Sequence, residues 1–135
     1  MEGIIKVTPD KEKAKSIFKM ANSTLRMIRH IDYFEFSSNV VVHYYDVIRE
    51  LMSVVLLLDG YKTIGESSHK RLIEYIKENC NEFSLKEISL IDELRRIRNK
   101  ISYDGFFVDK DFIEMRLTVI IGIIKKLKAI IKNYL

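Results

Sequence analysis

Three residues near position 100 have side chains suited to binding an anion: Arg98, Asn99 and Tyr103. At about 100° per helical residue, Arg98 falls near the edge of the apolar arc of its predicted helix. A charge that faces packed surface is costly unless it is paired, so Arg98 requires an acidic partner, a neighbouring subunit or an anionic ligand. A guanidinium group grips phosphate in a fork, an amide forms hydrogen bonds and a phenol stacks on a base.

Two interpretations of this segment remain open. In the first, Arg98, Asn99, Tyr103 and the adjacent Asp104 form a site for a nucleotide or for RNA. In the second, Arg98 pairs with a carboxylate inside the protein and Tyr103 simply packs, because structural ion pairs also place an arginine at such a position.

Other candidate residues carry weaker signals. His69 and Lys70 stand at the start of a short predicted helix, where an anion is favoured and a solvated position is the alternative. Arg95 falls outside the apolar arc, and we include it with these two as a further anion contact. Glu66 and His69 have the Glu-x-x-His spacing of a di-iron helix. Such a site needs two of these pairs and two more glutamates, so we predict neither a metal nor another cofactor.

The chain that positions these residues is helical in pattern. Apolar residues recur at steps of three and four, which is typical of amphipathic helices. Five Gly and one Pro in 135 residues leave few turns for a many-stranded fold. We expect an all-α domain spanning 1–135, with four long helices, one short helix and no strands. The predicted helices cover about 11–33, 40–58, 68–79, 84–102 and 109–134.

Local signals mark several helix ends. The run 37–39, Ser-Ser-Asn, offers an N-cap for the second helix, and Gly60 offers a left-handed cap at its end. Ser84 and Glu87 have the spacing of a capping box, and Gly105 ends the fourth helix. The second and last helices are apolar beyond one stripe. In a monomeric bundle each helix keeps a polar outer face, so this surplus predicts a second subunit.

Composition narrows the function classes. A net charge of +4 mildly favours binding to polyanions, although many proteins without such a function have a similar net charge. The one cysteine, Cys80, allows neither an internal disulfide nor a zinc site of paired thiolates. No signal peptide or membrane-spanning stretch is recognisable, so we expect a cytoplasmic protein. No glycine-rich phosphate loop, nucleophile elbow or dinucleotide fingerprint is present in the sequence.

Three motifs in this order resemble those of the HEPN family (higher eukaryotes and prokaryotes nucleotide-binding). The motifs are Tyr44-Tyr45-Asp46 leading to Leu56-Leu57-Leu58-Asp59-Gly60-Tyr61, then Ser68-His69-Lys70-Arg71-Leu72-Ile73, then Arg98-Asn99-x-x-x-Tyr103. The resemblance covers most of the chain. It implies an all-α up-and-down bundle, a four-helix bundle with one extra short helix, which dimerises with the Arg-Asn motif near the interface.

The resemblance also implies a set of functions. Many members are ribonucleases that cut without metal, with Arg and His acting on the scissile phosphate and the 2′-hydroxyl. Others are toxins paired with a small nucleotidyltransferase, or modules without known activity. In this sequence Tyr103 stands where the ribonuclease His would be, and tyrosine is a poor base near neutral pH.

We therefore predict a dimeric HEPN-like module. It would bind RNA or a nucleotide, or a nucleotidyltransferase partner, through Arg98, Asn99, Tyr103 and Asp104. One alternative is a metal-independent ribonuclease toxin of a toxin–antitoxin pair, with Arg98 on the phosphate and Tyr103 as a substitute catalytic group. The other is a purely structural helical dimer.

Overall fold

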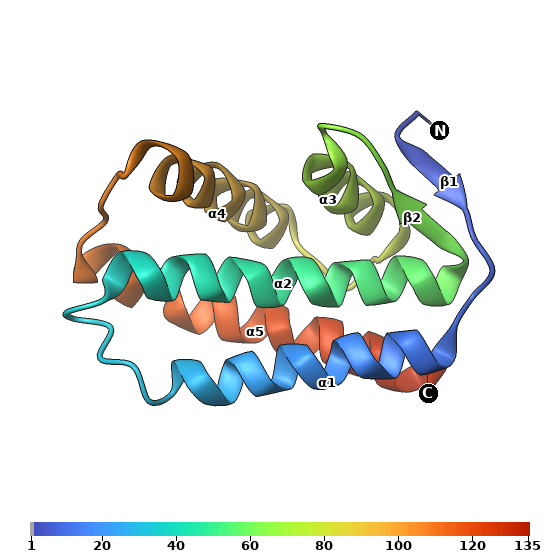
Figure 1. The fold of residues 1–135 in the computed structure, drawn as a ribbon, viewed down its shortest axis with the longest axis horizontal. Helices are drawn as coiled ribbons and strands as arrows, with labels where there is room; N and C mark the ends of the chain where they lie inside the picture. Colours follow the sequence, from blue (N-terminus) through green and yellow to red (C-terminus); the bar gives the residue numbers. More distant parts are fainter. Residues whose placement is uncertain (1) are drawn as a thin grey trace.

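Helix α2 (Ser37–Asp59) runs through the middle of the molecule, and the other helices pack around it (Figure 1). The computed structural model describes residues 2–135. The other elements over this range are β1 (Ile4–Lys6), α1 (Lys11–Ile28), β2 (Tyr61–Thr63), α3 (Ser68–Asn79), α4 (Leu85–Asp104) and α5 (Lys110–Tyr134). The predicted all-α bundle, with four long helices and one short one, is confirmed.

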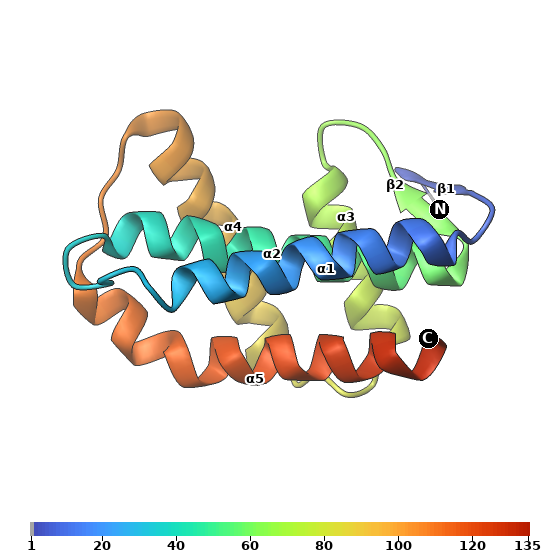
Figure 2. The ribbon, with the colours of Figure 1, turned by 60° about the horizontal axis from the view of Figure 1, so that its bottom comes forward.

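Three helices run lengthwise and two cross them. Helix α1 runs against the direction of α2, and α5 runs in the same direction as α2 (Figure 1). Helices α3 and α4 cross α2 steeply and run in opposite directions to each other, as Figure 2 shows. Both contact α2, and they also contact each other. This crossing brings the first turn of α3 and the second half of α4 to the same side of α2.

The prediction of a chain without strands is wrong in one place. Strands β1 and β2 pair antiparallel, with Ile4 opposite Thr63. Gly60 ends α2 with φ 89°, and its carbonyl accepts a hydrogen bond from the Val7 amide at 2.9 Å. The left-handed turn at Gly60 leads directly into β2. The backbone amide and carbonyl groups of β2 need hydrogen-bond partners, and β1 supplies them. A three-residue strand is too short to show the alternation by which strands are recognised.

Helix α1 is shorter than predicted, ending at Ile28 rather than near 33. The carboxylate of Asp32 accepts a hydrogen bond from the Phe34 amide at 2.9 Å, which forms a turn. Asp side chains compete in this way with helical hydrogen bonds, so the turn replaces the last predicted helical residues.

Ser37 and Ser38 do not cap α2 as predicted. Helix α2 begins at Ser37, and its N-cap, Phe36, makes no side-chain cap hydrogen bond. Instead, Ser37 Oγ donates to the Val108 carbonyl at 2.6 Å, and the Val108 amide donates to Ser38 Oγ at 2.9 Å. Both serines are buried. They attach the segment between α4 and α5 to the start of α2.

Other predicted helix ends are confirmed. Ser84 and Glu87 form the capping box of α4, and Gly105 ends that helix in a left-handed conformation. The side chain of Asp109 caps α5 by accepting from the Phe112 amide.

The apolar surplus has two different explanations in the structure. Most of α2 is buried between its neighbours, so its surplus is covered inside one chain; its largest fully buried side chains are Tyr45, Ile48, Leu51, Met52 and Leu56. On the outer side of α4 and α5 large apolar side chains are not covered within one chain, since Leu85 is 74% and Met115 is 79% exposed. Over residues 2–135, no helix has the length and hydropathy to cross a bilayer.

Replacing Ser38 by alanine tests the link between α2 and the α4–α5 segment. We expect Ser38→Ala to lower the free energy of unfolding by about 1–3 kcal/mol, because the Val108 amide loses its acceptor in a partly buried position. Urea denaturation followed by circular dichroism measures it. Asn39→Ala is the matched control, since Asn39 is exposed and caps nothing. A larger loss for Asn39→Ala would contradict this account.

Candidate functional site

Arg98 lies on α4 and points toward a carboxylate of α2. Its Nη2 atom is 3.6 Å from Asp46 Oδ1, and its side chain is 20% exposed. The Nε atom of Arg49, one turn along α2, is 3.9 Å from the same oxygen. Two guanidinium groups from different helices therefore share one carboxylate.

Neither contact satisfies the polar atoms involved. Four buried atoms in this region have no hydrogen-bond partner among residues 2–135: Tyr45 Oη, Asp46 Oδ1, Arg49 Nε and Arg98 Nε. Buried polar atoms in folded proteins are almost always hydrogen-bonded. Their concentration in one place therefore distinguishes it from the rest of the interior.

His69, in the first turn of α3, completes the group from a third helix. The centres of the His69 and Tyr45 rings are 6.1 Å apart. Burial lowers the pKa of the His69 imidazole, and the positive charges of Arg49 and Arg98 lower it further. Arg95 acts in the same direction, whereas Asp46 opposes it. The His69 ring is therefore neutral near pH 7.

We call this group the arginine cluster: Tyr45, Asp46, Arg49, His69, Arg95 and Arg98. Asp46, Arg49 and Arg98 together carry one net positive charge. Burial raises the pKa of the Tyr45 hydroxyl to about 12, so it stays a neutral hydrogen-bond donor. Arg95 pairs with Asp92, with Nη2 3.0 Å from the carboxylate, and it shares that carboxylate with Arg96. The cluster can thus accept a small anion.

No family model, no curated protein and no solved structure matches this chain. Its function is therefore inferred from the chemistry of the arginine cluster and the surfaces beside it.

The structure brings together three residues singled out in the sequence and separates the others. Arg98, Arg95 and His69 belong to the arginine cluster. Asn99 lines a shallow pocket of about 450 Å³ with Arg96 and Lys100, and Arg98 is not part of that lining. The remaining candidates, Lys70, Tyr103 and Asp104, are exposed.

Each open interpretation keeps part of its support. The internal carboxylate that pairs with Arg98 exists and is Asp46. Tyr103, however, is 75% exposed, so it does not pack as the structural interpretation expects. Within residues 2–135, no three His, Cys, Asp or Glu side chains are arranged to hold a metal ion.

Sequence reasoning missed the contribution of α2 to the site. Asp46, Arg49 and Glu50 are the charged residues between positions 40 and 58, in an otherwise apolar helix. A charge inside such a run needs a partner from another element, and that signal points to Asp46 and Arg49. Tyr45 gives no comparable signal, because an aromatic residue in an apolar helix is ordinary core.

The lowered pKa of His69 predicts a dependence of stability on pH. As pH falls through about 6.5, the ordinary pKa of histidine, the unfolded chain binds a proton at this position more readily than the folded chain does. We expect the free energy of unfolding to fall from pH 7.5 to 5.5, and to fall less steeply in His69→Gln. Urea denaturation at several pH values measures this slope. His30→Gln, at an exposed position, is the control and should keep the parent slope; equal slopes in the parent and His69→Gln would refute the assignment.

Proposed function

We propose that this chain binds the phosphate group of RNA or of a nucleotide at the arginine cluster. The observation that carries the proposal is the shared carboxylate. Asp46 lies 3.9 Å from Arg49 and 3.6 Å from Arg98, and the Nε of each arginine is buried without a hydrogen-bond partner among residues 2–135. One carboxylate cannot neutralise two guanidinium groups. A phosphate supplies the missing negative charge and several acceptor oxygens in the geometry that arginine favours.

The start of α3 supports the same ligand. Its N-cap, Ser67, makes no side-chain hydrogen bond to the first turn. The Ser68 amide donates to the Gly65 carbonyl at 3.2 Å, so the amides of His69 and Lys70 and the positive end of the helix dipole are the groups available to an anion here. The neutral His69 ring and the Tyr45 hydroxyl would add donors.

The proposal agrees with the HEPN resemblance in its use of Arg98. It differs in the partners of that residue, which come from α2 and α3 instead of from Asn99 and Tyr103. The imidazole that the family motif supplies four to six residues after the arginine is here supplied by His69, from a different helix.

RNA cleavage is a second candidate function, and His69 favours it. In metal-free cleavage a base removes the 2′-hydroxyl proton. The oxygen then attacks the phosphorus, the bond from phosphorus to the 5′-oxygen breaks, and that oxygen takes a proton from water, which leaves a cyclic phosphate end. A neutral imidazole can act as that base, and Arg49 and Arg98 would stabilise the charge that develops on the phosphate. Tyr103, the substitute considered from sequence, is largely exposed.

We propose in addition that two copies of the chain pair through α4 and α5. A pocket of about 310 Å³ between these helices has an apolar part formed by Leu90, Met115 and Val119, and its other lining residues are Lys86, Ser89, Glu93 and Arg116. Glu93 lines both this pocket and the one containing Asn99. A second copy would thus cover the side of α4 that carries Asn99, as the HEPN resemblance implies.

Substitution of Arg98 tests the binding proposal. We expect Arg98→Ala to raise the Kd for single-stranded RNA at least about ten-fold, which corresponds to about 1.4 kcal/mol, because it removes the guanidinium fork. Fluorescence anisotropy with labelled RNA measures this. Arg98→Lys keeps the charge and should retain part of the affinity. Arg96→Ala is the matched control, because Arg96 pairs with Asp92 and is 63% exposed.

The same protein samples decide between binding and cleavage. Metal-stripped protein is incubated with total RNA beside His69→Ala and Tyr103→Phe. Cleavage that only His69→Ala abolishes supports the ribonuclease, whereas cleavage that only Tyr103→Phe abolishes favours the sequence-based alternative. Retention of RNA without cleavage supports a binding module. If the protein neither retains nor cleaves RNA, both proposed functions are wrong and the structural dimer is the alternative that is left.

Light scattering tests the proposed pairing. We expect the parent to have twice the chain mass of 15.9 kDa, and the double variant Leu85→Glu/Met115→Glu to be monomeric. Four new charges cannot be buried in an apolar interface without partners. Met20→Glu, on the exposed side of α1, is the control and should leave the mass unchanged. A monomeric parent would contradict the pairing and leave this face to another partner, such as a small nucleotidyltransferase.

A further inference from the structure

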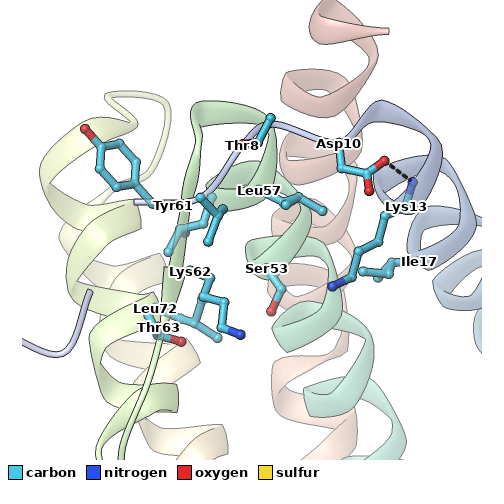
Figure 3. A pocket seen from close by; sticks show the side chains of 12 residues that line it. Thr8, Asp10, Lys13, Ile17, Ser53, Leu57, Tyr61, Lys62, Thr63 and Leu72 are labelled. Carbon is cyan, nitrogen blue, oxygen red and sulfur yellow. Dashed lines mark hydrogen bonds between the residues drawn. The ribbon is translucent and has the colours of Figure 1, made fainter. Parts of the chain in front are cut away.

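A concave site lies at the C-terminal end of α2, where the small sheet meets α1. The pocket there, whose lining residues are drawn in Figure 3, has a volume of about 410 Å³, within the usual range for small-molecule sites. We call it the hairpin pocket. Its lining is Val7, Thr8, Asp10, Lys13, Ile17, Ser53, Leu56, Leu57, Tyr61, Lys62, Thr63 and Leu72.

The lining divides into an apolar part and a cationic part. The apolar part includes the buried side chains of Leu56, Leu57 and Leu72. The ammonium groups of Lys13, from α1, and Lys62, from β2, extend into the pocket from opposite sides (Figure 3). A ligand with an apolar body and an anionic end would match both parts.

Neither lysine is neutralised by the protein. Among residues 2–135, no carboxylate lies within 4 Å of Lys13 or Lys62, whereas Lys15 of the same helix pairs with Glu12 at 3.5 Å. Asp10 is the acidic residue in the lining, and its carboxylate accepts the hydrogen bond of the Lys13 backbone amide as the cap of α1. The two ammonium groups therefore remain available to a ligand.

The walls of the pocket are held in place before any ligand arrives. The Val7 amide donates to the Gly60 carbonyl, and β1 pairs with β2. A Cβ at Gly60 would lie 3.3 Å from the Val7 carbonyl oxygen, at a φ of 89° that side chains rarely adopt. Ser53 Oγ is also fixed, by its hydrogen bond to the Arg49 carbonyl at 3.0 Å. Pre-organised walls reduce the entropy that binding costs.

From these observations we propose that the hairpin pocket binds a small organic anion, with its apolar body against the leucines and its anionic group between Lys13 and Lys62. The site is separate from the arginine cluster and does not depend on the function proposed for it. Thr8 and Thr63 line the same pocket, and a threonine hydroxyl there would help to orient the anionic group.

Phenyl phosphate is the probe that tests this proposal. Titration is followed by the methyl NMR signals of Leu56 and Leu57, which line this pocket two turns beyond Arg49 on α2. We expect these signals to shift, and inorganic phosphate and benzyl alcohol each to bind at least about ten-fold more weakly, because each matches only one part of the lining. Benzoate in place of phenyl phosphate shows whether carboxylates or phosphate esters are preferred.

Substitution of the lysines completes the test. Lys13→Ala and Lys62→Ala should each weaken phenyl phosphate binding about ten-fold, since each removes a charge-assisted hydrogen bond. Lys15→Ala is the matched control and should bind like the parent. Unshifted leucine signals, or unchanged binding by both lysine variants, would overturn the proposal. So would inorganic phosphate binding as tightly as phenyl phosphate, because the apolar part would then play no role.

Discussion

The burial of α2 is the constraint on which the rest of the structure depends. Its side chains from Val40 to Leu58 contact helices on several sides, so few of them reach water. Every polar group on such a helix needs a partner. Ser37 and Ser38 find one in the backbone of Val108, and Ser53 finds one in the carbonyl of Arg49.

Asp46 and Arg49 do not follow this rule, because Asp46 Oδ1 and Arg49 Nε have no hydrogen-bond partner among residues 2–135. These two residues are the part of the arginine cluster that α2 contributes, together with Tyr45. Arg98 arrives from α4 and adds a second positive charge to one carboxylate, while several polar atoms stay without partners among residues 2–135. A chain selected only for stability would pair these charges fully or replace them by apolar side chains. Local rules are most often broken at functional sites, which supports anion binding as the reason for this arrangement.

The arginine cluster and the hairpin pocket border the same helix. Ser53, in the hairpin pocket, lies one turn beyond Arg49, and Leu72 of the pocket lies one turn beyond His69 on α3. The pairing of β1 with β2 forms a wall of the hairpin pocket, and the crossing of α3 over α2 brings the residues of the arginine cluster together. Positive charge exceeds negative charge at both places: Arg49 and Arg98 share one carboxylate, and Lys13 and Lys62 have no carboxylate within 4 Å among residues 2–135.

The sequence by itself determined most of the helices and their ends. Period-3.6 patterns and caps such as Ser84, Gly60 and Gly105 act within a few residues, so they can be recognised locally. It also showed that Arg98 needs a partner. Only the tertiary structure decided that this partner is Asp46 and that His69 lies beside it, because both contacts join residues far apart in the chain. The same reason explains β1 and β2, whose short strands exist only through their pairing with each other.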